Sequence, residues 1–243
     1  MRKQAYIRTV LAAGMALLVT VMVTACGGRT VAEGPAEVVL HTTAGDIRLE
    51  LDGRTPRHRD NFLRLTREGF FDSLLFHRVI AGFMVQSGDP DSRRAPAGTL
   101  LGECDAGYEV PAEIVYPALG HTRGALAAAR TPDSVNPEKK SSSSQFFIVW
   151  GKQMTEEELD RAQERVTTGT NGRITIPDSL LALYRTLGGT PYLDGQYTVF
   201  GHVTEGLEVV GAIQRAATDS LDRPLADVRI LRAEVVREPG IKR

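Results

Sequence analysis

Apolar and polar residues alternate over the first strongly patterned segment of the chain. Residues 38–40 are apolar, a turn is expected at 44–46, and residues 47–51 alternate between apolar and charged side chains. A period of two is that of a strand with one face buried and the other in water. The pattern therefore predicts a β-hairpin.

The pattern then changes to that of a helix. Thr55 suits the N-cap, Pro56 suits the first helical position, and Gly69 suits the end. A second amphipathic helix is predicted over 207–215. Further strands are predicted at 74–80, 83–86, 124–129, 145–150, 197–203 and 227–236. Many short strands with only two helices favour a closed β-barrel, because closure leaves no strand edge exposed.

Residues 151–190 interrupt this series of strands with a helical pattern. Thr155 and Glu158 have the spacing of a capping box. A second helix is expected to begin at 177–178 and to end at the glycine pair 188–189. We expect a helical hairpin inserted into a β domain, with helices that pack on each other and need little from the strands.

The first 25 residues have a different character. A basic start, MRKQAYIR, precedes an apolar run over 10–23 that is short for a membrane-spanning helix. The run ends at Val-Thr-Ala before Cys26, which resembles the lipobox of bacterial lipoproteins. A plain signal peptide cut nearby, or an anchor that is retained, are the alternatives.

The lipobox resemblance implies a signal peptide over 1–25, acyl chains on Cys26, a tether over 26–36 and a folded domain over 37–243. Several acyl chains would hold the chain stably at a membrane. By analogy, Gly27 after the cysteine favours the outer membrane of a bacterial cell envelope, and we expect the domain to face the periplasm.

Charge and motif content exclude several classes of function. The chain has 29 basic and 30 acidic residues, so no net field favours a nucleic-acid partner. The five histidines lack ligand spacing and Cys104 is the only other cysteine, so neither a metal site nor an internal disulfide of the mature chain is expected. Nucleophile-elbow, P-loop and dinucleotide-binding motifs are missing from the sequence. What remains is Arg78, a permanent charge within the mostly apolar run 76–89.

Four segments around and beyond this arginine resemble the cyclophilins, which are peptidyl-prolyl cis-trans isomerases. They are FHRVIAGFMVQSGD (76–89), GALAAAR (124–130), SSQFFIV (143–149) and LDGQYTVFGHVTEGLEVV (193–210). Their order and spacing match over 38–236, apart from the insertion. The resemblance implies a mainly β fold, an eight-stranded antiparallel barrel closed by two helices. It also implies unfolded or partly folded proline-containing polypeptides as partners, and no cofactor.

The resemblance also assigns residues to roles. Arg78 matches the family's catalytic arginine, and Gln86 matches the side chain that orients it and the substrate backbone. The walls of the proline pocket match Phe83, Met84, Phe147 and Leu193, and the peptide groove matches Ala129 and Gln145. Three residues depart from the commonest pattern, which has asparagine, tryptophan and histidine where this chain has Arg130, Tyr192 and Tyr197. We expect Tyr192 and Tyr197 to bind substrate, because the ring of Tyr197 can close the pocket and its hydroxyl can donate.

Two function classes follow from these residues. One is an enzyme that accelerates X–Pro rotation in exported proteins. The other is a binding module that holds proline-containing chains without turnover. The combination of Arg78 with Phe83 and Gln86 favours the enzyme, because a binder has no use for a donor directed at a transition state. The insertion either extends the groove toward longer substrates or decorates the surface.

Overall fold

The computed structural model describes residues 32–241. The expected signal peptide and Cys26 lie outside the described residues. The last part of the expected tether is not a tether, because β1 (Ala32–Glu33) pairs with β12 (Gly240–Ile241) and β2 begins at Ala36. Within 32–241 no helix combines the length and the apolar character that crossing a bilayer requires.

An antiparallel sheet of eight strands forms the centre of the domain. The predicted hairpin is confirmed as β2 (Ala36–Thr42) and β3 (Gly45–Leu51). The other six strands of this sheet are β4 (Arg78–Ile80), β5 (Met84–Ser87), β7 (Ala125–Ala128), β9 (Phe146–Val149), β10 (Val199–Glu205) and β11 (Ile230–Arg237). A short pair, β6 (Glu109–Val110) with β8 (Ser141–Ser142), lies outside it.

The sheet curls into a half-barrel and does not close, so the closed barrel expected from the sequence is wrong. The strand order β11-β2-β3-β10-β7-β9-β5-β4 leaves β11 and β4 as its two edges. The strand predicted over 74–80 is observed only over 78–80, as β4. The residues before β4 contact the other edge of the sheet through one isolated β-bridge, between Leu75 and Arg229. Backbone hydrogen bonds from Ser73 N–H and Phe76 N–H to Ile230 and Val228 accompany that bridge.

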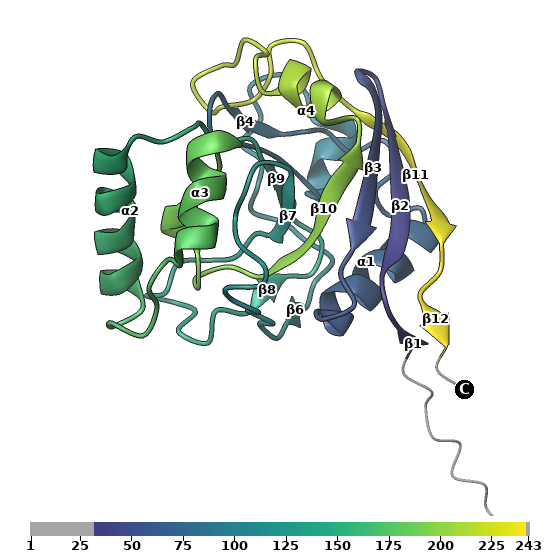
Figure 1. Ribbon diagram of the computed structural model, residues 1–243. Coiled ribbons are helices and arrows are strands. Elements are labelled where there is room, and N and C mark those ends of the chain that lie inside the picture. Colours follow the sequence, from purple (N-terminus) through teal and green to yellow (C-terminus); the bar gives the residue numbers. More distant parts are fainter. Residues whose placement is uncertain (1–31, 242–243) are drawn as a thin grey trace, which may run out of the picture. The chain divides into compact units, whose positions relative to one another are not determined.

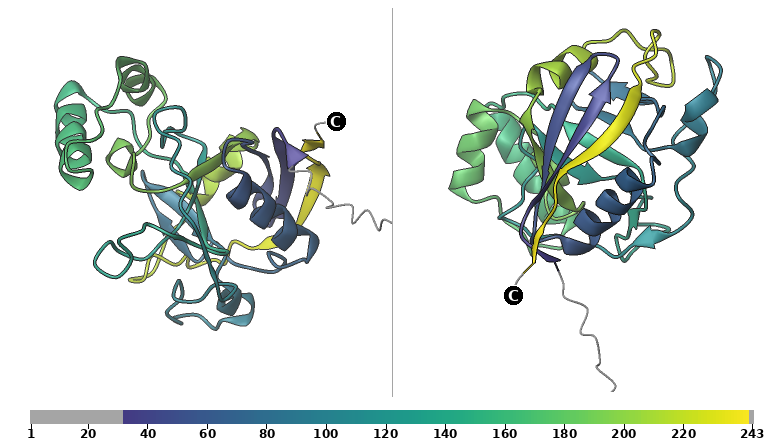
Figure 2. Two further views of the ribbon diagram at one scale, coloured as in Figure 1. Left: turned by 90° about the horizontal axis from the view of Figure 1, so that it is seen from below. Right: turned by 90° about the vertical axis from the view of Figure 1, so that its right-hand side faces the viewer.

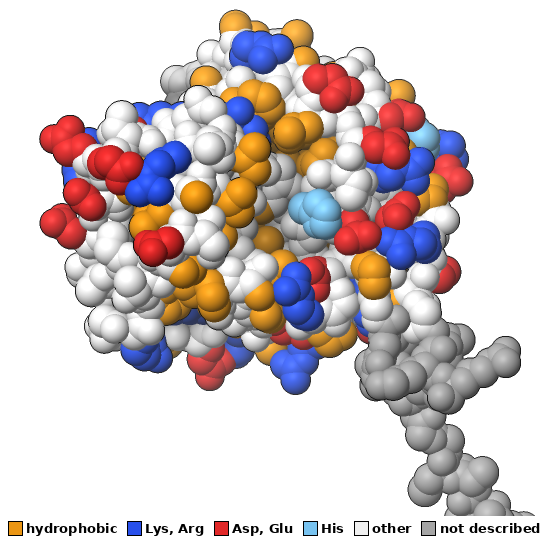
Figure 3. Space-filling view, viewed as in Figure 1, with side chains coloured by type: hydrophobic (Ala, Val, Ile, Leu, Met, Phe, Trp, Pro, Cys, Tyr) orange, Lys and Arg blue, Asp and Glu red, His pale blue; other side chains and the backbone are white. Residues whose placement is uncertain are grey.

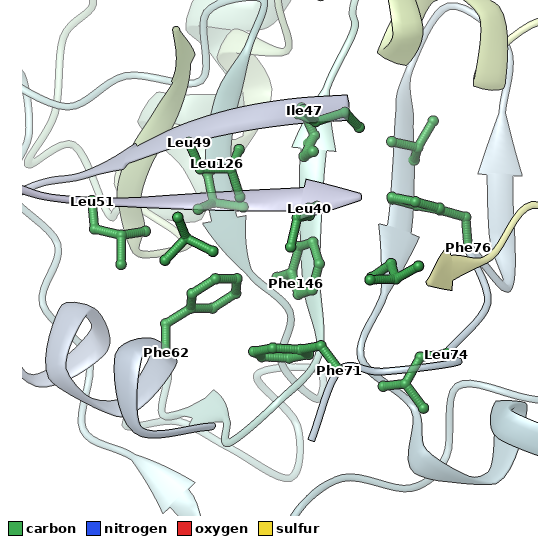
Figure 4. Close-up of a cluster of buried hydrophobic side chains, with 14 of the residues drawn as sticks. Leu40, Ile47, Leu49, Leu51, Phe62, Phe71, Leu74, Phe76, Leu126 and Phe146 are labelled. Atoms are coloured by element: carbon green, nitrogen blue, oxygen red, sulfur yellow. The ribbon is translucent and has the colours of Figure 1, made fainter. Parts of the chain in front are cut away.

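The main hydrophobic core fills the inside of the curl. Alternate residues of the hairpin contribute to it, and rings from the first helix and the next loop complete it (Figure 4). Phe62 packs against Phe71 and Phe146 with ring centroids 4.6 and 5.3 Å apart. Burial of such side chains is the main favourable contribution to folding.

Two helices cover opposite ends of the half-barrel, as Figures 1 and 2 show. They are α1 (Pro56–Arg67) and α4 (Leu207–Ile213), close to the ranges expected. Thr55 precedes α1 but makes no side-chain cap bond. Instead the carboxylate of Glu113 accepts the backbone N–H groups of Arg57 and His58 at 3.1 and 3.0 Å. A negative charge is favourable at the N-terminus of a helix. Glu113 therefore caps α1 in place of the Thr55 side chain.

Residues 151–190, the segment expected to be an insertion, form the helical hairpin that the sequence predicts. Its helices are α2 (Glu156–Gly169) and α3 (Asp178–Thr186), and the capping box of Thr155 with Glu158 is present. Two short 3-10 helices, η1 (Pro90–Arg94) and η2 (Pro191–Leu193), lie in the loops. The inserted helices lie on the opposite side of the domain from β2 and β11 (Figures 1 and 2).

The hairpin is less independent than expected. Its apolar cluster, built around Leu159, Val166 and Tyr184, also takes in Tyr116 from outside the insertion. The helix α2 packs against η2, and the fully buried Tyr184 donates a hydrogen bond to Asp194, which follows η2. The hairpin therefore shares its core with the β domain.

Candidate active site

The register of the strands lines up the central residues of the site. Arg78 on β4 lies opposite Gln86 on β5, Gln86 lies opposite Phe147 on β9, and Phe147 lies opposite Ala127 on β7. Side chains directly opposite one another project from the same face of a sheet. These four residues therefore form one row across the outer face of the half-barrel.

A second apolar cluster covers this outer face. The strands β7 and β9 are buried along their whole length, because the main core covers one face and this cluster the other. Its buried members are Met84, Ala125, Ala127, Phe147, Val149 and Val199. This double burial explains the continuous apolar segments 125–128 and 146–149, which lack the alternation of the hairpin.

A pocket of about 140 Å³ lies over this second cluster. Eight residues that the resemblance indicates line it together with Arg130: Arg78, Phe83, Met84, Gln86, Ala129, Phe147, Leu193 and Tyr197. Two expected residues lie beside it. Gln145 lines a neighbouring pocket that shares Gln86 and Ala129, and Tyr192 lines a separate pocket next to the hairpin.

Arg78 keeps most of its hydrogen-bonding capacity free. Its Nη1 donates to Oε1 of Gln86 at 3.4 Å, and its Nε lies 3.5 Å from a carboxylate oxygen of Asp222. Both contacts are long, and the side chain is 44% exposed. Because a guanidinium carries five N–H donors, several remain available at the pocket wall.

A chain of side-chain amides fixes the orientation of Gln86. Nε2 of Gln145 donates to the backbone carbonyls of Gly102 and Cys104, both at 2.8 Å. Oε1 of Gln145 is therefore the atom left to face Gln86, and it accepts a hydrogen bond from Nε2 of Gln86 at 2.9 Å. This leaves Oε1 of Gln86 directed at Arg78. Gln145 thus fixes the orientation of Gln86 and also lines the neighbouring pocket.

Arg130 holds Tyr197 against the pocket. Its guanidinium lies 4.5 Å from the centroid of the Tyr197 ring, and its side chain is only 5% exposed. It is fixed by Asp133 at 2.6 Å and by the carbonyls of Gln196 and Thr131. The sequence identifies Arg130 only as a departure from the family pattern. Its position directly after Ala129 is the one signal that it lines the pocket.

Sequence reasoning missed a buried group behind the pocket. Nδ1 of His121 lies 2.9 Å from Oδ1 of Asp194, and the hydroxyl of Tyr184 donates to the other oxygen at 2.7 Å. The His121 ring stacks on Phe147 at 6.2 Å with an interplanar angle of 11°. Burial, and then the charge of Asp194, raise the pKa of Tyr184, so its hydroxyl remains a donor. A residue of the insertion therefore supports the pocket floor.

One group in the described range has the spacing of metal ligands: Asp89, Asp91 and Cys104. The oxygens of Asp89 accept the backbone N–H groups of Asp91 and Gly102. A hydrogen bond with Asp91 raises the pKa of the Cys104 thiol to about 11, which keeps it protonated. Because Asp89 already accepts two backbone N–H groups, the observed contacts of this group are those of a loop-stabilising residue.

The buried side chain of His77, next to Arg78, should make the stability of the protein depend on pH. Burial lowers the pKa of His77 from 6.5 to about 4. The unfolded chain takes up a proton near pH 6.5 and the folded chain only near pH 4, so the free energy of unfolding falls as pH falls between these values. The difference corresponds to about 3 kcal/mol.

We expect urea unfolding between pH 7 and pH 4 to show this loss for the wild type, and a smaller slope for His77→Leu, which cannot titrate. The comparison of slopes is independent of any constant destabilisation by the leucine. Parallel pH profiles for the two proteins would contradict a buried neutral His77.

Comparisons with known proteins agree with this geometry. Residues 37–235 match the family described as "Cyclophilin type peptidyl-prolyl cis-trans isomerase/CLD". The "Peptidyl-prolyl cis-trans isomerase-like 1" of Neurospora crassa is 32% identical over 208 residues, which cover 85% of this chain and 98% of that protein. The "Peptidyl-prolyl cis-trans isomerase CYP18-2" of Arabidopsis thaliana is 32% identical, covering 83% and 94%.

Solved structures show the same fold. A crystal structure of a cyclophilin type peptidyl-prolyl cis-trans isomerase from Cryptosporidium parvum has a TM-score of 0.59 and 24% identity, covering 84% of this chain and 99% of that chain. A second structure of that protein, obtained in the presence of the dipeptide Ala-Pro, has a TM-score of 0.56.

Proposed function

The chain belongs to the cyclophilin-type peptidyl-prolyl cis-trans isomerases, and from this premise we propose that it acts on X–Pro bonds of exported polypeptides while anchored to a membrane by lipid on Cys26. The observation that carries the assignment of the catalytic group is the pocket wall. There Arg78, with free donors, stands over an apolar floor and is oriented by Gln86 and Gln145.

The chemistry needs a donor and a dry pocket, without covalent steps. Resonance gives the X–Pro bond a rotation barrier of about 18–20 kcal/mol. In the twisted transition state that resonance is lost, and the proline nitrogen regains a lone pair that can accept a hydrogen bond. A donor from Arg78 to this nitrogen stabilises the twisted state more than either planar state, and this difference is what accelerates rotation.

Arg78 cannot supply the whole effect. A hydrogen bond from a charged group contributes about 1.5–3 kcal/mol, and each tenfold in rate takes about 1.4 kcal/mol. The donor thus accounts for roughly 10- to 100-fold. The remainder is assigned to the apolar walls, Met84, Phe147 and Leu193, which would hold the proline ring while the preceding residue turns.

The proposed substrate class has support from a relative. The Cryptosporidium protein was crystallised in the presence of Ala-Pro. In this chain the pocket of about 140 Å³ has apolar walls and a donor at one side, which suits a proline ring with its preceding carbonyl at the polar edge.

The lipid anchor is tested by Cys26→Ala. This change removes the only thiol in the lipobox-like segment, so we expect complete loss of fatty-acid labelling and of normal removal of the signal peptide. Metabolic labelling with a radioactive fatty acid, followed by comparison of the sizes of the two proteins on a gel, measures both. Cys104→Ala is the matched control and should keep full label. Equal labelling of the Cys26 variant and the wild type would refute lipid attachment at this site.

A further inference from the structure

The insertion builds a second pocket beside the proline pocket. It has a volume of about 220 Å³ and is lined by Lys152, Met154, Glu158, Arg161, Ala162, Arg165 and Tyr192. Neighbouring residues of η2 serve the two pockets, since Leu193 lines the proline pocket and Tyr192 the second one. The rings of Tyr192 and Phe83 are 6.0 Å apart, so only one aromatic layer separates the pockets.

The charges lining this second pocket are unequally compensated. Lys152 pairs with Glu158 at 2.5 Å, and Glu158 also accepts the backbone N–H of Thr155 in the capping box. The carboxylate nearest Arg161 is that of Glu157, at 3.9 Å and 84% exposed. Such exposed pairs contribute little. The single acidic residue in the lining is therefore already used.

Arg165 has no carboxylate within ion-pair distance in the described part of the chain. Its guanidinium instead lies 5.8 Å from the centroid of the Tyr192 ring. Tyr192 is half-buried and Arg165 is exposed, and their contact places the guanidinium at the wall of the pocket. Figure 3 shows several acidic side chains at the left edge of the view and others on its right-hand side. The lining of the second pocket itself has three basic residues and only one acidic residue, so it presents positive charge.

We propose that this pocket binds an acidic side chain of the substrate polypeptide, two or three residues away from the proline. The proposal rests on the isomerase function above and names a preference of the same groove. A guanidinium fork matches a carboxylate in two hydrogen bonds, and the apolar parts of Met154 and Ala162 reduce access of water to the pair. An extended chain advances about 3.3 Å per residue, so two or three residues span the aromatic layer between the pockets.

The test uses peptides with one Ala-Pro bond and a single Glu. The Glu stands two or three positions before the proline in one set of peptides and two or three after it in the other set, and each peptide has a partner with Gln in its place. Isomerisation is followed without protease by NMR exchange, and the Kd is measured in parallel. We expect one placement, the one that extends toward Tyr192, to favour Glu over Gln by about 5-fold in kcat/KM and in Kd. This preference should weaken with added salt.

The double change Arg161→Gln with Arg165→Gln should bring the Glu-to-Gln ratio to about 1. Arg94→Gln is the matched control, because Arg94 is exposed on η1 and makes no ion pair in the described residues. It should keep the 5-fold ratio. A ratio near 1 in the wild type for both placements, or a ratio that survives the double change, would overturn the proposal.

A protein without isomerase activity would give a different result from one whose second pocket lacks a preference for Glu. It would leave the exchange rate of every peptide unchanged, including that of the Gln peptides. The Kd comparison would still decide whether the pocket prefers Glu.

Discussion

Arg78→Lys should lower kcat/KM for an Ala-Pro tetrapeptide by about 30-fold, while the Kd of the peptide rises less than about 3-fold. Lysine keeps one positive charge but lacks the planar guanidinium group. In the wild type, one N–H of this group donates to Gln86 and another would donate to the substrate. A loss of about 2 kcal/mol is what a charged hydrogen bond made only in the transition state would cost. The change should therefore appear in kcat.

The measurement is protease-free isomerisation kinetics with binding by titration. Arg94→Lys is the control, since it makes the same chemical change at an exposed position outside the pocket lining. If Arg78→Lys turned over substrate nearly as fast as the wild type, the guanidinium would not be needed for catalysis. If the Kd rose in parallel with the loss of activity, Arg78 would contribute to ground-state binding and not to the transition state.

Replacement of residues 153–187 by a short Gly-containing turn should lower the free energy of unfolding by about 3–5 kcal/mol and tetrapeptide turnover by more than tenfold. The chain can be closed there, because Lys152 and Gly189 form a β-bridge at the base of the hairpin. The cost arises because the replacement removes Tyr184, which is fully buried and bonded to Asp194. Without that bond the support of His121 beneath Phe147 is weakened.

This expectation differs from the one the sequence favours, in which the helices of the hairpin need little from the strands. Tyr184→Phe isolates the contact with Asp194, since it removes a single oxygen, and should cost about 1–2 kcal/mol in urea unfolding. A hairpin-free protein with wild-type stability and turnover would return the insertion to the role of surface decoration.

The strands and the pocket lining were predictable because their signals are local or carried by motifs. The hairpin 36–51 alternates with period two, and Arg78, Gln86 and Phe147 lie in segments whose order matches the family. The open edge was not predictable. Residues 74–77 are buried throughout, and a continuous buried segment lacks the alternation that would mark where a ladder begins.

The contacts missed by sequence reasoning join residues far apart in the chain. Glu113 caps α1 from 55 residues away, and Asp194 meets His121 across 73 residues. Such pairs depend on how the elements pack, and neither residue type nor spacing identifies them. The same is true of Arg130, whose side chain could have pointed into solvent but stacks on Tyr197.

The most direct test of the central claim is the exchange rate of an Ala-Pro tetrapeptide, measured by two-dimensional NMR with a catalytic amount of wild-type protein beside Arg78→Ala. One spectrum gives both the exchange between cis and trans peptide and the shift changes that report binding. We predict fast exchange with the wild type, and exchange at least 30-fold slower with the variant while binding shifts persist. Binding shifts with no acceleration by the wild type would contradict the account, because they would identify a groove that holds proline without turning it.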